Sequence, residues 1–266
     1  MTDETAVVPA QPTETISFGQ AHLTADQLIP PRVKIVQMMS AERASKQAEA
    51  GNFWNTLTSE DLGNEIKFLP LSTFMNRVLL VRDQRRDQAD IQLKAAKLPK
   101  LTEGDGLKCR SIDMEHGNGE PGIVCDACPL SKWWGPGNTE APLCSEVYNV
   151  AALTELGDLV ILQFQRSSAK VGRKFFSMLR FAGPGVAPWS RFYVARTHEE
   201  QGPKGPFFAP VVNRVADEVP PTELMRQAYA WAAVLGNTAI DVTPAEDEEA
   251  EVAGAPGAEP KDGDPF

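Results

Sequence analysis

The chain has 266 residues, of which 42% are hydrophobic and 23% are charged, close to the averages for soluble globular proteins. Its formal net charge of −10 argues, taken alone, against nucleic acid as a partner. No run approaches the roughly 18 consecutive apolar residues of a membrane span, and the acidic N-terminus shows no secretory signal. We therefore expect a cytoplasmic protein without a membrane partner.

The net charge hides a segregation along the chain. Residues 30–215 carry 24 Lys and Arg against 20 Asp and Glu, whereas residues 216–266 carry 2 against 12. Residues 1–29 carry four acids and no base. A basic body thus lies between two acidic ends, an asymmetry that restores nucleic acid as a possible partner of the body.

Composition also predicts the domain boundaries. Residues 1–28 are rich in Thr, Glu and Pro, and residues 241–266 form an acidic tail of low complexity. Both have too few large apolar groups to offset chain entropy, so we expect both to be disordered. The remaining body, residues 29–240, has the size of one domain.

Periodicity within the body predicts mostly strands. In chain order, the predicted elements are a helix over 41–51, strands over 65–71, 77–83 and 159–166, a helix over 167–183, strands over 189–197 and 207–215, and a helix over 222–236. The last helix places Leu224, Ala228, Trp231 and Leu235 on one face. Several strands, one inserted helix and two more strands favour a mainly β fold with a few helices. The architecture we expect is a small closed barrel of the oligonucleotide-binding (OB) type.

All four cysteines fall within 36 residues, with the spacing C-x15-C-x2-C-x15-C: Cys109, Cys125, Cys128 and Cys144. Thiols of a cytoplasmic protein are more often metal ligands than disulfides. The Cys125–Cys128 pair forms a knuckle, and the two outer cysteines complete a tetrahedral set typical of one structural Zn²⁺. The sequence therefore predicts a zinc-binding insertion over residues 104–145. Four unrelated cysteines, a redox pair, or His116 in place of Cys109 are the alternatives.

A basic, aromatic stretch runs from Gln163 to Arg196 and contains no Asp or Glu. Cations that follow phosphates, with rings on which unpaired bases stack, are typical of proteins that bind single strands. Alternation along residues 189–196 places Trp189, Arg191 and Tyr193 on one face. The residues predicted to contact DNA, with additions from neighbouring segments, are Arg77, Arg82, Arg85, Lys132, Trp133, Trp134, Arg166, Lys170, Arg173, Lys174, Trp189, Arg191, Tyr193 and Arg196. The alternative is that most of the rings are core and the basic residues only solvate a face.

The acidic tail ends in a large apolar ring, Phe266, preceded by Asp262, Asp264 and Pro265. A tethered phenyl group beside carboxylates suits a hydrophobic pocket rimmed by Lys or Arg on a partner protein. The alternative is a tail kept for solubility, with an incidental phenylalanine.

The Asp-x-Asp-Pro-Phe ending resembles the acidic tip of bacterial single-stranded DNA-binding proteins, whose final Pro-Phe docks replication and repair partners. The basic body, cysteine cluster and tail together are similar to bacteriophage single-stranded DNA-binding proteins, some of which carry a structural zinc. The segments that carry this likeness are PPRVKIVQ (30–37), GNFW (51–54), LGNEIKFLPL (62–71) and CSEVYNV (144–150). The cysteine pattern, which bacterial members generally lack, favours the phage type and a host-cell cytoplasmic location.

These features predict sequence-independent binding of single-stranded DNA in phage replication, recombination or repair. The tail is expected to recruit replication or recombination proteins and to mask the DNA groove, and self-association on DNA is possible. The alternatives are a strand-annealing mediator, a zinc-bearing regulator that binds duplex DNA, and an interaction adaptor that acts only through its tail. We do not expect an enzyme, because the sequence shows no nucleophile–base pair, phosphate-binding Gly-rich loop or open metal site.

Overall fold

The structure, a computed structural model, describes residues 31–202, 205–216 and 218–235. Its strands are β1 (Arg32–Ile35), β2 (Phe53–Asn55), β3 (Glu60–Asp61), β4 (Glu65–Val81), β5 (Gly106–Ser111), β6 (Asn118–Gly119), β7 (Cys144–Thr154), β8 (Leu159–Gln165), β9 (Tyr193–Gly202) and β10 (Gly205–Arg214). Its α-helices are α1 (Ala41–Ala44), α2 (Asp83–Ala95), α3 (Ala169–Arg180) and α4 (Thr222–Leu235). The segments 1–28 and 241–266, predicted to be disordered, lie outside the described residues. No described helix has both the length and the apolarity needed to cross a membrane.

One mixed sheet organises the fold, so the prediction of a mainly β protein with a few helices is confirmed. The strand order is β10-β9-β4-β7-β8-β1-β2-β3, with β5 and β6 attached beside β4. Only β1 and β8 run parallel; the other pairs are antiparallel. Within the described residues this backbone ladder stays open, so it does not form the closed barrel that we expected.

A side chain bridges the gap between the sheet's β10 edge and the end of β1. The Gln37 amide Nε2 donates to the Phe208 carbonyl at 3.0 Å, and Gln37 Oε1 accepts from the Phe208 N–H at 2.9 Å. One carboxamide therefore satisfies both backbone groups of a residue on the free edge of β10. The sheet curls far enough for β10 and the segment after β1 to meet without a shared ladder.

The main core lies between the curled sheet and α3. Phe68, Phe175 and Tyr193 pack ring against ring there, with centroids 5.0 to 6.3 Å apart. Gly172 lets α3 approach the sheet, because an added Cβ would lie 2.6 Å from Tyr148 Cβ and 2.7 Å from Phe164 Cβ. The helix keeps its basic residues on the opposite face, which gives it a clear apolar side and a clear charged side.

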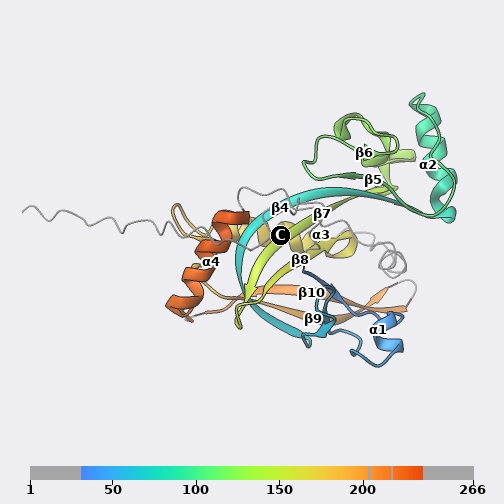
Figure 1. The fold of residues 1–266 in the computed structure, drawn as a ribbon. Helices are drawn as coiled ribbons and strands as arrows, with labels where there is room; N and C mark the ends of the chain where they lie inside the picture. Colours follow the sequence, from blue (N-terminus) through green and yellow to red (C-terminus); the bar gives the residue numbers. More distant parts are fainter. Residues whose placement is uncertain (1–30, 203–204, 217, 236–266) are drawn as a thin grey trace, which may run out of the picture.

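A second core lies under α4. The predicted apolar face of this helix is confirmed: Leu224 and Ala228 are buried, and Trp231 and Leu235 pack against the same cluster. Figure 1 shows α4 at one end of the sheet, opposite the cysteine-bearing lobe.

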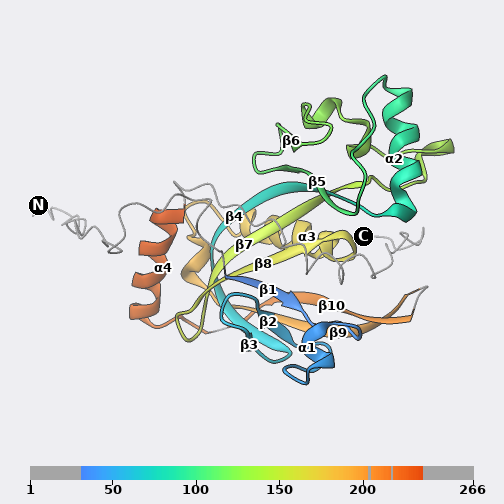
Figure 2. The ribbon, with the colours of Figure 1, turned by 45° about the vertical axis from the view of Figure 1, so that its right-hand side comes forward.

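That lobe spans residues 82–143 and stands at the far end of β4 and β7 (Figures 1 and 2). It contains α2, the β5–β6 hairpin and three short 3₁₀ turns, η2 (Cys125–Ala127), η3 (Pro129–Ser131) and η4 (Pro136–Asn138). A small apolar cluster of its own holds it together: Leu79, Val81, Ala89, Leu93, Leu101, Cys128, Leu130 and Leu143. The predicted insertion at 104–145 is thus part of a larger unit that includes α2.

Several predicted elements differ from the observed ones. The strands predicted over 65–71 and 77–83 are one continuous strand, because residues 72–76 pair with β7 instead of turning. The helix predicted over 41–51 is a single turn, and the strand predicted from residue 189 begins at Tyr193, after a 3₁₀ turn. Helix α2 is absent from the prediction because its apolar face is only a few residues wide.

Candidate nucleic-acid interface and cysteine centre

The fold brings the four cysteines together. Cys109 on β5 and Cys144 on β7 both pair with Leu79, which lies on β4 between them. Residues directly opposite in antiparallel strands project to the same face, so these two thiols share one face of the sheet. The Cys125–Cys128 knuckle packs against that face, since Cys128, Cys109 and Cys144 belong to one apolar cluster.

Local hydrogen bonds fix the knuckle. The Cys125 N–H donates to the Glu115 carbonyl at 2.8 Å, which ties the turn to the β5–β6 loop. The Ser131 hydroxyl donates to the carbonyls of Cys125 and Cys128 at 2.8 and 2.9 Å. The backbone amides of Leu130 and Ser131 point at the Cys128 sulfur. Amides aimed at a sulfur favour its thiolate form, as a metal-binding knuckle requires.

The four thiols are close enough to affect one another electrostatically. Burial first, and then the neighbouring Cys128, Cys109 and Cys125, together raise the pKa of Cys144 to about 12. Burial is also the main cause that raises the pKa of Cys109 and of Cys128. Four ionised thiols at this place would therefore need a cation between them.

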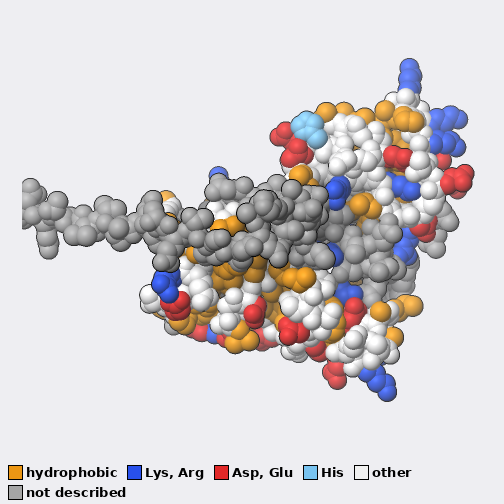
Figure 3. Space-filling view, in the orientation of Figure 1, with side chains coloured by type: hydrophobic (Ala, Val, Ile, Leu, Met, Phe, Trp, Pro, Cys, Tyr) orange, Lys and Arg blue, Asp and Glu red, His pale blue; other side chains and the backbone are white. Residues whose placement is uncertain are grey.

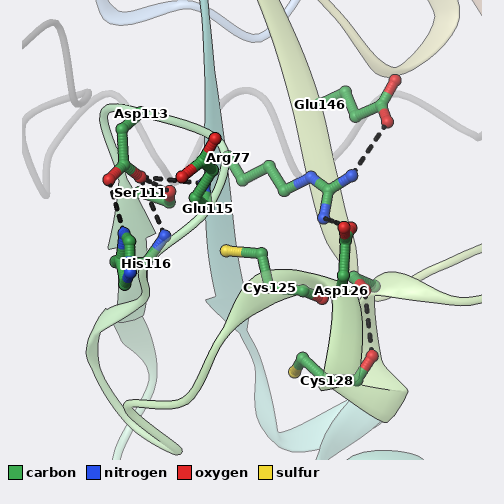
Figure 4. Close-up of polar contacts among 10 residues, drawn as sticks. Arg77, Ser111, Asp113, Glu115, His116, Cys125, Asp126, Cys128 and Glu146 are labelled. Carbon is green, nitrogen blue, oxygen red and sulfur yellow. Dashed lines mark hydrogen bonds and ion pairs between the residues drawn. The ribbon is translucent and has the colours of Figure 1, made fainter.

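As the side chains stand, no group of three or more His, Cys, Asp or Glu in the described part of the chain meets the geometry for a metal ion. Binding zinc would require the thiols to turn toward one point. Figure 4 shows the sulfurs of Cys125 and Cys128 pointing to the same side of the knuckle. The burial, grouping and amide contacts fit a four-thiolate centre, and zinc remains a prediction.

His116, the alternative ligand, is engaged elsewhere. Its Nδ1 lies 2.8 Å from Asp113 Oδ2, and the side chain is exposed (Figure 4). Asp113 also accepts hydrogen bonds from the amides of Glu115 and His116, and the amide of His116 is the leading cause that lowers its pKa. This acid–imidazole pair shapes the loop beside the cysteines and holds the ring away from them.

Three of the predicted DNA-contacting arginines converge on one place. Arg82 follows β4 at the N-cap of α2, Arg85 lies in the first turns of α2, and Arg166 begins the turn that leads into α3. Burial first, and then the positive charges of Arg85 and Arg82, together lower the pKa of Arg166 to about 10. Arg166 has a left-handed backbone, with φ of 51°. We call Arg82, Arg85 and Arg166 the arginine cluster.

The outer face of α3 continues this positive surface. Lys170, Arg173, Lys174 and Arg180 are all exposed, at spacings that place them on one side of the helix. Phe181, the next residue, is 85% exposed. Phe181 is absent from the predicted contacts. The sequence could have indicated it, because Phe175 and Phe176 face the core and Phe181 comes directly after the helix that carries them. Figure 3 shows further Lys and Arg side chains gathered around the lobe.

The remaining predicted contacts lie elsewhere. Tyr193 is buried between Phe68 and Phe175, and Trp189 packs against Tyr229 of α4, so neither ring presents a face to a base. The strand begins at Tyr193 and Trp189 lies in the 3₁₀ turn Pro188–Ser190, so the expected alternation of Trp189, Arg191 and Tyr193 on one strand face is wrong. Arg196 is paired with Glu65 at 2.5 Å, and Arg191 is partly buried.

Lys132 and Trp133 are exposed on the lobe, whereas Trp134 is half-buried and pairs its backbone with Glu140. Arg77 lies on β4 next to the lobe, between the carboxylates of Asp126 and Glu146. The tail residues Asp262, Asp264, Pro265 and Phe266 lie outside the described residues.

A row of carboxamides that the sequence analysis did not single out crosses the sheet on the face opposite the main core. Asn149 donates to Asn76 Oδ1 at 2.7 Å and accepts from Gln163 Nε2 at 3.0 Å. Asn76 and Asn149 are buried, so the row joins β4, β7 and β8 as a structural network.

Comparison with known proteins gives one partial match. Residues 2–90, about a third of the chain, match the family model described as Pam3 phage gp34-like protein. The described part of that match contains β1, α1, β2, β3, β4 and the first turns of α2. No curated protein and no solved structure matches the chain. The family match indicates a bacteriophage protein.

Proposed function

We propose that this protein binds single-stranded DNA without sequence preference during phage DNA replication, recombination or repair. The observation that carries the proposal is the arginine cluster, which continues into the basic outer face of α3. The pKa of Arg166 is lowered mainly by burial and further by the charges of Arg85 and Arg82, so the three guanidinium groups lie close enough to repel one another. A phosphate beside them offsets that repulsion with strong, charge-assisted hydrogen bonds.

The bases would stack on exposed rings beside the phosphate path. Phe181 at the end of α3 and Trp133 on the lobe are the two candidates, with exposures of 85% and 50%. Stacking on such rings contributes about 1–3 kcal/mol per base and tolerates any base. This combination suits a protein that coats strands of arbitrary sequence.

The architecture that we propose is an OB-type barrel with an extra strand. The order β4, β7, β8, α3, β9, β10 places a helix between the third and fourth strands of a five-stranded unit. In this interpretation β1 is inserted where the barrel would close, and the Gln37 carboxamide joins it to β10. Such barrels commonly bind oligonucleotides on an exposed strand face and the adjoining loops.

The cysteine centre would hold one structural Zn²⁺ through Cys109, Cys125, Cys128 and Cys144. The bound ion would supply a cross-link among three segments, β5, the Cys125–Cys128 knuckle and β7, where the apolar cluster is small. Four thiolates would leave no open coordination position, so we assign the ion no catalytic role.

The decisive measurement is fluorescence anisotropy of a labelled oligo(dT) at low salt, with a duplex of equal length as competitor. Full-length protein should bind the single strand, and the logarithm of affinity should fall with log salt by about 0.7 per phosphate neutralised. Arg85→Met should weaken binding and reduce that slope, because Arg85 is an exposed member of the cluster. Lys94→Met, which removes an exposed charge from the same helix, is the matched control.

Each alternative has its own outcome. Preference for the duplex would replace the proposal with a regulator that binds double-stranded DNA. Absence of any oligo(dT) binding at low salt would favour an adaptor that acts through its tail. Equal losses from Arg85→Met and Lys94→Met would show that the arginine cluster is no special site.

A further inference from the structure

Arg77 lies beside the cysteines and not on the basic surface. It pairs with Ser111 on β5 and with Glu146 on β7. On β4 it lies two residues before Leu79, which pairs with Cys109 and Cys144. Residues two apart on a strand project to the same face, so Arg77 shares the face of the thiols. Its side chain is only 15% exposed, which leaves little of it for a DNA strand.

Two carboxylates hold the guanidinium in place. Nη2 lies 3.4 Å from Glu146 Oε1, and Nη1 lies 3.9 Å from Asp126 Oδ1 (Figure 4). Asp126 is inside the Cys125–Cys128 knuckle, and Glu146 follows Cys144 by two residues. Arg77 thus links the knuckle to the strand that carries a third cysteine.

One guanidinium nitrogen is buried with its hydrogen-bonding capacity unused. Among the described residues, Arg77 Nη1 has no hydrogen-bond partner, since Asp126 is too distant for one. A buried N–H donor without a hydrogen-bond partner, on the face that carries the cysteines, is better placed when the neighbouring thiols are anions.

We propose that Arg77 is a positioning residue of the cysteine centre, which compensates the negative charge of its thiolates and holds the knuckle against β7. This inference rests on the proposed zinc site. Four thiolates around one Zn²⁺ carry a net charge of −2, and a nearby fixed cation lowers the cost of burying that charge. Arg77 therefore acts on metal affinity and leaves DNA contact to other residues.

The test measures metal affinity and DNA binding on the same full-length variants. Purified apo-protein is titrated with Co²⁺, whose thiolate charge-transfer absorption reports tetrahedral binding, and Zn²⁺ affinity follows by competition. Arg77→Met should lower Zn²⁺ affinity about 10-fold or more, the usual effect of losing an outer-shell partner. Arg77→Lys, which keeps the charge, should recover part of the loss. Arg110→Met is the matched control, because Arg110 adjoins Cys109 but projects from the opposite face of β5.

The outcomes separate the two proposals. If wild-type protein binds neither Co²⁺ nor Zn²⁺ through its cysteines, the zinc proposal fails and the role of Arg77 fails with it. If wild-type protein binds zinc and Arg77→Met keeps that affinity within about twofold of the Arg110→Met control, only the role of Arg77 is overturned. A loss of oligo(dT) binding by Arg77→Met with unchanged metal affinity would return Arg77 to the DNA surface. Partial recovery in Arg77→Lys distinguishes a charge effect from misfolding of the methionine variant.

Discussion

At the scale of single residues, the structure depends on places where no side chain fits and on side chains with fixed partners. Gly172 sits where α3 touches the sheet, and Gly117 faces the Cys109 sulfur, where an added Cβ would lie 2.9 Å away. Asp113 orders the loop before that glycine through its bonds to neighbouring amides and to His116. These positions decide how closely neighbouring segments approach each other.

Gly172→Ala should destabilise the protein even though alanine is the better helix former. Alanine gains about 0.5–1 kcal/mol in an open helix, but here its Cβ would press on Tyr148 and Phe164 and force α3 away from the sheet. We expect a net loss of about 1–3 kcal/mol in the free energy of unfolding, measured by urea denaturation. Ser177→Ala, on the exposed face of the same helix, should be within about 0.5 kcal/mol of wild type. A Gly172→Ala variant as stable as wild type would contradict the close packing.

His116 should titrate above its ordinary pKa of 6.5, because the Asp113 carboxylate bonds to its ring. A raised folded-state pKa means that this pair stabilises the loop below pH 6.5, and that the contribution is lost as pH rises through the raised value. NMR titration of the imidazole shifts tests this. Asp113→Asn should bring the pKa back toward 6.5, and a wild-type value at or below 6.5 would refute the interaction.

At the scale of elements, the free edge of β10 is closed to further strand pairing. Phe208 directs its N–H outward to Gln37, so Pro206 and Pro210, two residues away on either side, occupy positions whose N–H would also point outward. Proline has no N–H to offer there. The edge is thus blocked by two prolines and one side-chain clasp, a common way in which proteins avoid edge-to-edge aggregation.

Gln37→Ala should therefore destabilise the fold and open this edge. The change leaves the Phe208 N–H and carbonyl without partners, at a cost of about 1–3 kcal/mol in unfolding free energy. Hydrogen exchange at the Phe208 amide should accelerate more than exchange at amides in the middle of β7. Gln47→Ala, which removes an exposed glutamine, serves as the control and should change neither quantity. Unchanged exchange at Phe208 would show that the clasp does not hold the edge.

At the scale of the whole molecule, the positive charge belongs to the folded body and the negative charge to the C-terminal segment. The arginine cluster and the outer face of α3 belong to the described body, whereas residues 241–266 carry nine acids and one base. A tethered anion competes with DNA phosphates at high effective concentration, and salt weakens that competition.

Deleting residues 241–266 should accordingly tighten oligo(dT) binding, with the largest effect at low salt. Anisotropy titrations of the two chains over a range of salt concentrations measure it. Deleting only Pro265 and Phe266 keeps every charge and should leave DNA affinity unchanged, while removing the proposed docking group for partner proteins. Equal affinities of the full and truncated chains at low salt would rule out masking by the tail.

The sequence predicted the elements with strong local patterns and missed those that depend on distant partners. The strand ending at Gln165 and the helix ending at Leu235 have clear apolar periodicity, and both are confirmed. The polar residues Ser72, Thr73 and Asn76 suggested a turn, and only pairing with β7 makes them strand. Helix α2 has too few apolar residues to show a period.

The same division applies to the candidate site. The cysteines were predictable as a group because short loops limit how far they can separate, and spacing alone therefore indicated a common centre. The meeting of Arg166 with Arg82 and Arg85 was not, since more than 80 residues separate them in the sequence. Arg77 and Tyr193 were predicted to contact DNA by residue type, and only their neighbours in the fold show how little of each side chain is exposed.

The continuity of β4 has a practical consequence for dissecting this protein. At about 3.3 Å per residue, its 17 residues form one strand of about 50 Å that pairs with β7 in the central sheet and with β5 of the cysteine lobe. Excising residues 82–143 would remove β5 and most of the apolar cluster that cover the ends of β4 and β7, and the exposed strand ends would invite pairing with other chains. Variants for separate study should instead be made by shortening the lobe's own loops, with β4 kept whole.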